Sequence, residues 1–147
     1  MTATSRRPLS ALWSGEPGYA HAVLAVSGSV LAGMVVEFVR GGGALVPPAW
    51  PTNAVFLGLF LGWLVPLSLS DGRLVAWIGG VPFALASMLG VGLLGALGGI
   101  IPQTPDQTPG WVQFFGLNHV FTGVPLDGAM LLLLTSLGLA TLRKVRS

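Results

Sequence analysis

The sequence predicts an all-α polytopic membrane protein, with four transmembrane helices in an antiparallel bundle and one long outer loop that carries a short interfacial helix. The first observation is composition: the 147 residues are 52% hydrophobic and 8% charged, and the mean hydropathy is +0.79. Because about a quarter of a soluble domain is charged, so few charges leave most of this chain to be solvated by lipid. The second observation is that apolar runs of about 20 residues recur between polar or Pro- and Gly-rich breaks.

The four apolar runs cover about residues 18–40, 51–70, 74–101 and 126–143, and together form one membrane domain over residues 18–147. A helix rises about 1.5 Å per residue, so each run is long enough to cross the hydrocarbon. Residues 1–17 are polar and basic and form an N-terminal tail. We expect the first run to be a retained helix rather than a cleaved signal peptide, because further spans follow it.

The connections predict how the helices are arranged. A short polar turn at residues 70–73 makes the second and third spans antiparallel neighbours. Pro66 is expected to kink or end the second span, because proline lacks the N–H that the helix needs. The outer loop at residues 102–125 becomes aromatic in its second half and predicts a short helix at the membrane interface. Its aromatic residues are Trp111, Phe114, Phe115 and Phe121.

Small residues predict where helices approach closely. The third span contains a GxxxG pair, Gly95 and Gly99, and many further small residues. Such residues let helix backbones approach in lipid, so we expect this span to form the centre of the bundle. The same surface also suits a groove for a flat ligand. In the first span, Ser29 and Gly33 form a second pair of small residues with the same spacing.

The distribution of charge predicts the orientation. With four spans, six of the seven Lys and Arg residues fall on the side of the two termini, and only Arg40 falls on the other. The positive-inside rule then places both termini in the cytoplasm of a multi-pass protein of the cell inner membrane. The six residues are Arg6, Arg7, Arg73, Arg143, Lys144 and Arg146. A net charge of +2 that is spread in this way indicates a lipid bilayer as the partner, and no nucleic acid.

Two carboxylates lie in or near the predicted spans. Glu37 is inside the first span, where an ionisable group normally faces the bundle interior or a polar cavity. The alternative is that Glu37 lies at headgroup depth and pairs with Arg40, three residues further along the helix. Asp127 is near the start of the fourth span, where the helix dipole favours a negative charge, so we expect it to cap that helix.

Two histidines, His21 and His119, are the candidate haem ligands. His119 lies in the outer loop among aromatic residues, a setting that suits an axial ligand of haem b. His21 lies at the opposite end of the first span from Glu37, about 24 Å away along the helix axis, and is expected to be an interfacial residue. The chain contains no cysteine, which excludes disulfides and thiolate metal sites. We see no nucleophile–base pair, carboxylate dyad or phosphate loop and expect no independent catalytic activity.

Three short motifs carry a resemblance to a known family. They are WPTN at residues 50–53, IIPQ at residues 100–103 and LGLATLRK at residues 137–144. In this order they resemble the membrane part of ResB-type proteins of system II cytochrome c biogenesis, particularly forms related to the fused ResB–ResC proteins. The resemblance implies a module that helps carry haem across the membrane and present it to apocytochrome c, together with a ResC-like partner.

The chain departs from that family in two respects. The family has a large extracytoplasmic domain, so the resemblance implies a reduced relative, a split part that needs a partner, or a relative that has lost haem handling. The family also uses a histidine within a span as a haem ligand, whereas the second span here contains none, so no ligand position is carried over.

Three functions follow from these observations. The first is a ResB-like module that assists cytochrome c maturation, either by handling haem or by scaffolding a ResC-like partner. The alternative is a non-catalytic structural subunit of a larger membrane complex. A small transporter ranks last, because only Glu37 and Pro66 suggest a polar or broken path through the spans.

Overall fold

The computed structural model describes residues 17–41, 52–103, 107–115 and 117–146, and these are helical with no strand among them. Four helices are long and apolar enough to cross a membrane, which confirms the all-α polytopic fold. The predicted N-terminal tail and the loop before the second span lie outside the described residues. The elements in chain order are α1 (Tyr19–Arg40), α2 (Thr52–Leu69), α3 (Arg73–Ile78), α4 (Val81–Ile100), α5 (Gly110–Phe114), η3 (Leu117–Thr122) and α6 (Val124–Arg146).

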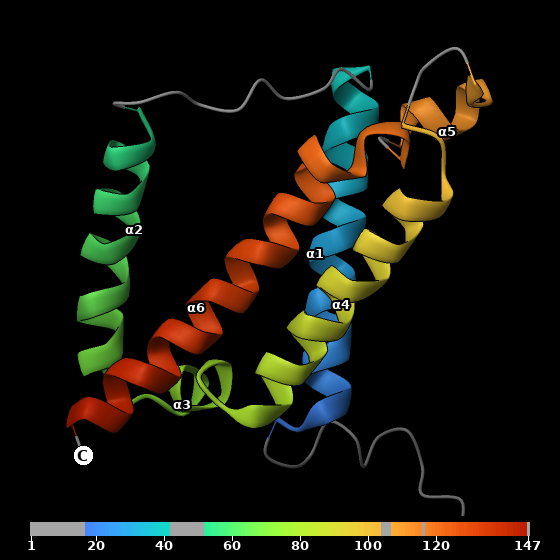
Figure 1. The fold of residues 1–147 in the computed structure, drawn as a ribbon. Coiled ribbons are helices and arrows are strands. Elements are labelled where there is room, and N and C mark those ends of the chain that lie inside the picture. Colours follow the sequence, from blue (N-terminus) through green and yellow to red (C-terminus); the bar gives the residue numbers. More distant parts are fainter. Residues whose placement is uncertain (1–16, 42–51, 104–106, 116, 147) are drawn as a thin grey trace, which may run out of the picture.

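Helix α6, and not the third span, is the centre of the bundle. It contacts α1, α2 and α4, whereas the main helix partners of α4 are α1 and α6. Figure 1 shows α1 and α4 side by side, α6 crossing them obliquely, and α2 standing apart from both at the other side of α6. The prediction that the small residues of the third span mark the centre is therefore wrong, because α6 is the helix that contacts the three other long helices.

The third apolar run is interrupted, although the sequence predicted one helix over residues 74–101. Helix α3 ends at Ile78 and α4 begins at Val81, with Gly79 and Gly80 between them. Pro82 causes the break, because it cannot donate a hydrogen bond to the carbonyl of Ile78 and its ring would clash with that carbonyl. Gly80 takes an extended conformation, with φ −92 and ψ 162.

This break changes which helices are neighbours. Helix α3 lies across one end of the bundle and carries the chain from the end of α2 to the start of α4 (Figure 1). Helix α2 is consequently packed mainly against α6, and of the predicted third span it meets α3 and not the long helix α4. The contact is a small cluster of Leu64, Val75 and Leu139, from α2, α3 and α6. Pro66 lies inside α2, which continues to Leu69.

Close helix approach occurs at some of the predicted small residues and not at others. A Cβ added to Gly33 would lie 2.7 Å from the Cα of Pro125, which confirms that Ser29 and Gly33 allow α1 to approach α6. A Cβ added to Gly95 or Gly99 would meet nothing within 4 Å in the described part of the chain. These two glycines therefore do not pack the described helices of this chain together. That they pack against a helix of another chain remains a prediction.

Replacing Gly33 with Ala is expected to destabilise the protein by about 1–3 kcal/mol, because the new methyl group meets backbone atoms of Pro125 that cannot rotate away. Gly28→Ala is the matched control on the same helix, since its Cβ would meet nothing within 4 Å. Thermal unfolding in detergent should show a lower midpoint for Gly33→Ala alone. Equal midpoints for the two variants would contradict the close contact.

Candidate functional site

The loop end of the bundle, where α1 and α4 end and α6 begins, holds a group of interacting polar residues. Residues 101–123, called the return segment here, leave α4 and fold back onto this end through α5 and η3 (Figure 1). The interface helix predicted in this region is two short helices, and η3 contacts both α4 and α6. Val120 of η3 is 3% exposed and packs with Leu94 of α4 and Ala129 of α6. The return segment is therefore part of the packed structure.

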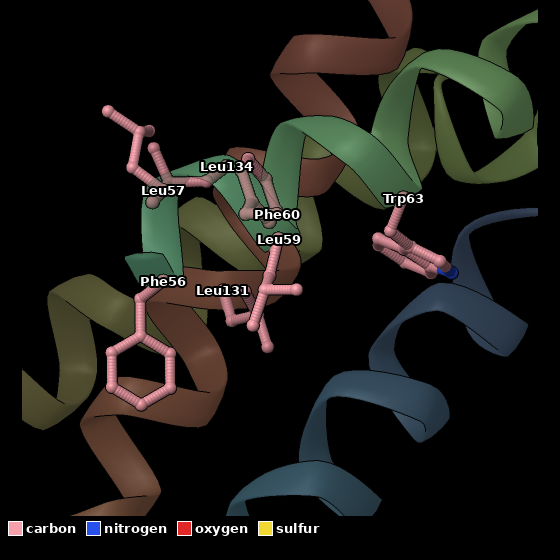
Figure 2. A pocket seen from close by; sticks show the side chains of 7 residues that line it. All are labelled: Phe56, Leu57, Leu59, Phe60, Trp63, Leu131 and Leu134. Carbon is pink, nitrogen blue, oxygen red and sulfur yellow. The ribbon is translucent and has the colours of Figure 1, made fainter. Parts of the chain in front are cut away.

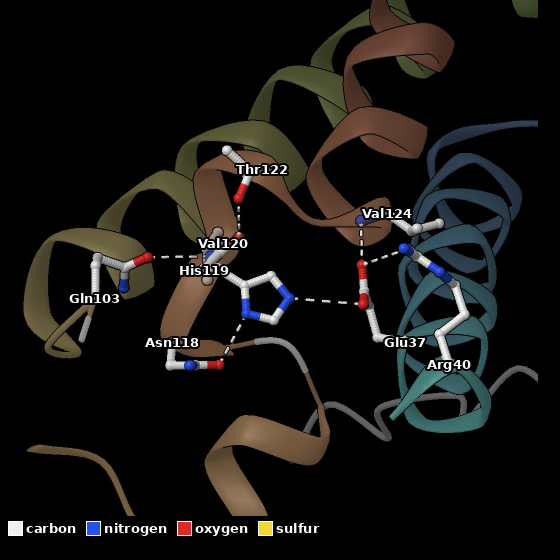
Figure 3. A network of polar contacts seen from close by, with 8 residues as sticks. All are labelled: Glu37, Arg40, Gln103, Asn118, His119, Val120, Thr122 and Val124. Atoms are coloured by element: carbon white, nitrogen blue, oxygen red, sulfur yellow. Dashed lines mark hydrogen bonds and ion pairs between the residues drawn. The ribbon is translucent and has the colours of Figure 1, made fainter. Parts of the chain in front are cut away.

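Gln103 holds the return segment at the end of α4. Its amide nitrogen donates to the carbonyl oxygens of Ile101, at 2.8 Å, and Leu117, at 3.3 Å. Its amide oxygen accepts a hydrogen bond of 3.1 Å from the backbone N–H of Val120 (Figure 3). One side chain thus pairs with three backbone groups in a segment without a regular hydrogen-bond ladder.

Glu37 lies at the centre of the polar residues, and its side chain is fully buried. Its Oε1 accepts a hydrogen bond of 2.8 Å from the backbone N–H of Val124, the first residue of α6. The Nη1 atom of Arg40 lies 3.7 Å from the same oxygen. A carboxylate at this position satisfies a free N–H of α6 and interacts favourably with the helix dipole. Glu37 thus faces the interior, as the first interpretation expected, and also lies beside Arg40, the pairing that the alternative expected.

His119 approaches Glu37 from the return segment (Figure 3). Its Nε2 lies 3.6 Å from Oε2 of Glu37, and its Nδ1 lies 2.9 Å from Oδ1 of Asn118. The side chain is 11% exposed. His119 has a non-helical backbone, with φ −143 and ψ 44, which interrupts η3 at this residue. Both ring nitrogens therefore face protein groups, and neither is directed outward as a free ligand.

The other predicted site residues lie elsewhere or have local roles. His21 is near the start of α1, where its Nδ1 accepts a hydrogen bond of 3.3 Å from the N–H of Gly18. Asp127 is in the first turn of α6, as expected for a residue that favours the helix start. The structure thus brings Glu37 and His119 together and leaves His21 at the opposite end of α1. No group of three His, Cys, Asp or Glu side chains able to hold a metal ion occurs among the described residues.

Gln103 and Asn118 were not identified as site residues from the sequence. Gln103 appeared only as a letter of the IIPQ motif, although a polar side chain placed directly after Pro102 at the end of an apolar run was an available signal. Asn118 precedes His119 in the chain, and nothing in the sequence indicated that it would contact the imidazole ring.

An apolar groove between α2 and α6 is the second feature of note. It has a volume of about 540 Å³, and Figure 2 shows the side chains that line it. Phe56, Phe60 and Trp63 line it from α2, and Leu131 and Leu134 from α6. The groove presents almost no polar surface, so a polar ligand would lose its hydrogen bonds on entering. It therefore suits hydrocarbon, which the surrounding bilayer supplies.

No protein-family model, curated protein or solved structure matches this chain. The resemblance to ResB-type proteins consequently stays a prediction. The fold and the polar residues define the class: a small polytopic α-helical membrane protein whose return segment is fixed to the bundle by a buried carboxylate and an amide side chain.

Replacing Gln103 with Ala is expected to release the return segment, because the N–H of Val120 and two carbonyl oxygens lose their partner. A loss of about 1–3 kcal/mol of local stability should raise the hydrogen-exchange rate of the Val120 amide by about tenfold or more. Gln107→Ala is the control, since Gln107 is exposed in the same segment. Unchanged exchange at Val120 in Gln103→Ala would show that these hydrogen bonds do not hold the segment.

Proposed function

We propose that this protein is a ResB-like scaffolding module that binds a ResC-like membrane partner during cytochrome c maturation. The observation that supports scaffolding over haem handling is the environment of His119, whose two ring nitrogens face Glu37 and Asn118. Handling haem through this residue would require His119 to leave both partners. The three motifs that resemble ResB-type proteins are the reason for proposing cytochrome c maturation. The contacts of His119 with Glu37 and Asn118 are the reason for proposing scaffolding.

The return segment offers a suitable surface for such a partner. Trp111 and Phe121 are 64% and 56% exposed, although Gln103 accepts a hydrogen bond from Val120 in the segment that carries them. Exposed aromatic side chains on an ordered support are typical of protein contact surfaces, because little side-chain entropy is lost on binding. Gly95 and Gly99 of α4, where an added Cβ would meet nothing within 4 Å, offer a second contact inside the membrane.

A structural subunit of a different membrane complex is the second candidate function, and helix α2 favours it. Among the described residues of α2, only Leu64 and Ser68 are buried. A helix attached to the rest of its own chain at so few positions is suited to packing against a neighbouring subunit. The partner that co-purifies with the protein distinguishes this candidate from the first.

We also propose that the loop end faces away from the cytoplasm, with the protein in the cell inner membrane. Arg73, Arg143 and Lys144 lie toward the opposite end of the bundle, and the positive-inside rule places such clusters in the cytoplasm. A reporter enzyme that works only outside the cytoplasm should be active when inserted at Thr108 and inactive when fused after Ser147. The reverse pattern would overturn the orientation.

The scaffolding proposal is tested by co-purification from membranes. Leu substituted at Gly95 and Gly99 together should reduce recovery of the ResC-like partner by about tenfold or more, because close helix approach is lost. The stability of the isolated protein should not change, since both positions face open space. Gly28→Leu, on α1, is the control for a bulky residue at another open position.

Two results would overturn the scaffolding proposal. One is unchanged recovery of the partner with the Gly95 and Gly99 substitutions, or recovery of a complex unrelated to cytochrome c maturation. The other is a stoichiometric b-type haem spectrum of the purified protein that disappears with His119→Ala, which would favour haem handling.

A further inference from the structure

Two serine hydroxyls are buried inside the bundle without a hydrogen-bond partner. Ser87 of α4 and Ser136 of α6 are both 0% exposed, and neither Oγ atom forms a hydrogen bond among the described residues. The buried hydroxyls of Ser68 and Thr135 instead donate to a carbonyl of their own helix, at 2.6 and 2.7 Å. Because leaving a buried hydroxyl unpaired costs free energy, the positions of the two unpaired serines need a physical cause.

The two serines occupy matching positions on α4 and α6. Leu94 and Ala129 pack together with Val120 and mark the depth at which the two helices meet near the loop end. Ser87 lies seven residues before Leu94, and Ser136 lies seven residues after Ala129. Seven residues are about two helical turns, so each serine lies on the same helix face as that apolar residue. Because α4 runs toward the loop end and α6 runs away from it, both steps lead to a similar depth (Figure 1).

Contacts on both sides of Ser136 show that this face of α6 stays turned toward the third span. Leu132, one turn earlier, packs against the buried cluster that contains Phe83 of α4. Leu139, one turn later, lies beside Gly79, where an added Cβ would be 3.1 Å from the Cβ of Leu139. Ser136 is therefore enclosed between two contacts with the third span.

Helix α1 closes the third side of this level with a small side chain. Ala22 is 0% exposed and belongs to the same cluster as Phe83. It lies two turns before Ser29, whose Oγ would be 3.4 Å from a Cβ added to Gly128 of α6. Ser136 follows Gly128 by about two turns in the opposite direction, so Ala22 and Ser136 lie at a similar depth. The two hydroxyls thus lie at a junction of three helices to which α1 contributes only a methyl group.

We propose that Ser87 and Ser136 bind one buried water molecule, which bridges α4 and α6 beside Ala22. A hydroxyl both donates and accepts hydrogen bonds, so a single water molecule can pair with both Oγ atoms. Polar groups that lie at one level without bonding directly are typical sites of a bridging water, and buried waters pair with otherwise unsatisfied groups. The inference is independent of the proposed scaffolding role, because it concerns the interior of the bundle.

An indole N–H near the same junction is a further unpaired donor. Trp77 of α3 packs against the cluster that contains Ala22 and Phe83, and its ring lies edge-on to Phe83 at a centroid distance of 5.0 Å. Its Nε1 atom is buried and has no hydrogen-bond partner among the described residues. Unpaired polar atoms thus gather around one apolar cluster, as expected where ordered water is part of the packing.

The experiment uses the full chain in lipid nanodiscs with ¹³C-labelled alanine methyl groups. Magnetisation transfer from bound water to the methyl group of Ala22 reports the site. The methyl group of Ala129 is the internal reference, because it is also 0% exposed but packs against the apolar side chains of Leu94 and Val120. We expect transfer to Ala22 to be about tenfold or more stronger than transfer to Ala129.

Ser87→Ala and Ser136→Ala are the test variants, and each should abolish the transfer to Ala22. Each should also raise the equilibrium constant of unfolding by about fivefold, because the remaining hydroxyl loses its partner. The double variant should be hardly less stable than either single variant, since the two hydroxyls share one water molecule. Thr135→Val is the matched control on α6: the hydroxyl it removes donates to Leu131, so the transfer to Ala22 should persist.

Any of three results excludes the water site. The first, which needs no variant to fold, is transfer to Ala22 no stronger than to Ala129 in the unmodified protein. The second is transfer that survives in either single variant, because it then comes from the proton of the remaining hydroxyl. The third is a pair of serine substitutions whose effects on stability simply add or are stabilising, because each hydroxyl then acts alone.

Discussion

The buried carboxylate of Glu37 is the constraint on which the arrangement of the loop end depends. A carboxylate removed from water in a helical membrane protein costs several kcal/mol unless hydrogen bonds and opposite charges compensate it. The compensation comes from Arg40 on the same helix and from the N–H of Val124 at the start of α6, while His119 of the return segment lies 3.6 Å from the second carboxylate oxygen. Helix α1 and the start of α6 are therefore fixed relative to one another.

The position of α6 follows from this junction and determines the rest of the bundle. Helix α6 begins against α1, where Gly33 leaves room for the backbone of Pro125, and then crosses obliquely toward α2 (Figure 1). Near its far end, Gly138 leaves room for Leu64 of α2, while Leu139 packs against Leu64 and Val75. Because α2 is attached mainly through this contact, the rest of α2 and the middle of α6 line an apolar groove that is unfavourable for polar groups.

The same junction decides how His119 is interpreted. From the sequence, His119 was a candidate haem ligand because it lies among aromatic residues of the outer loop. In the structure its imidazole lies between Asn118 and Glu37, so neither ring nitrogen is directed outward as a free ligand. Trp111 and Phe121 of the same segment are exposed.

Composition and the lengths of the apolar runs determined the fold class, because a chain of 8% charged residues can be solvated only by lipid and the backbone in lipid must be helical. The sequence also located the carboxylate of Glu37, its neighbour Arg40 and the small pair of Ser29 and Gly33. Tertiary structure alone decided that Glu37 meets Val124, 87 residues away, because local spacing does not specify which helix end comes to lie beside a buried side chain. It likewise decided that α6 is central and that Gly95 and Gly99 face outward. Small residues make a close approach sterically accessible, but the partner is chosen by the packing of the whole bundle.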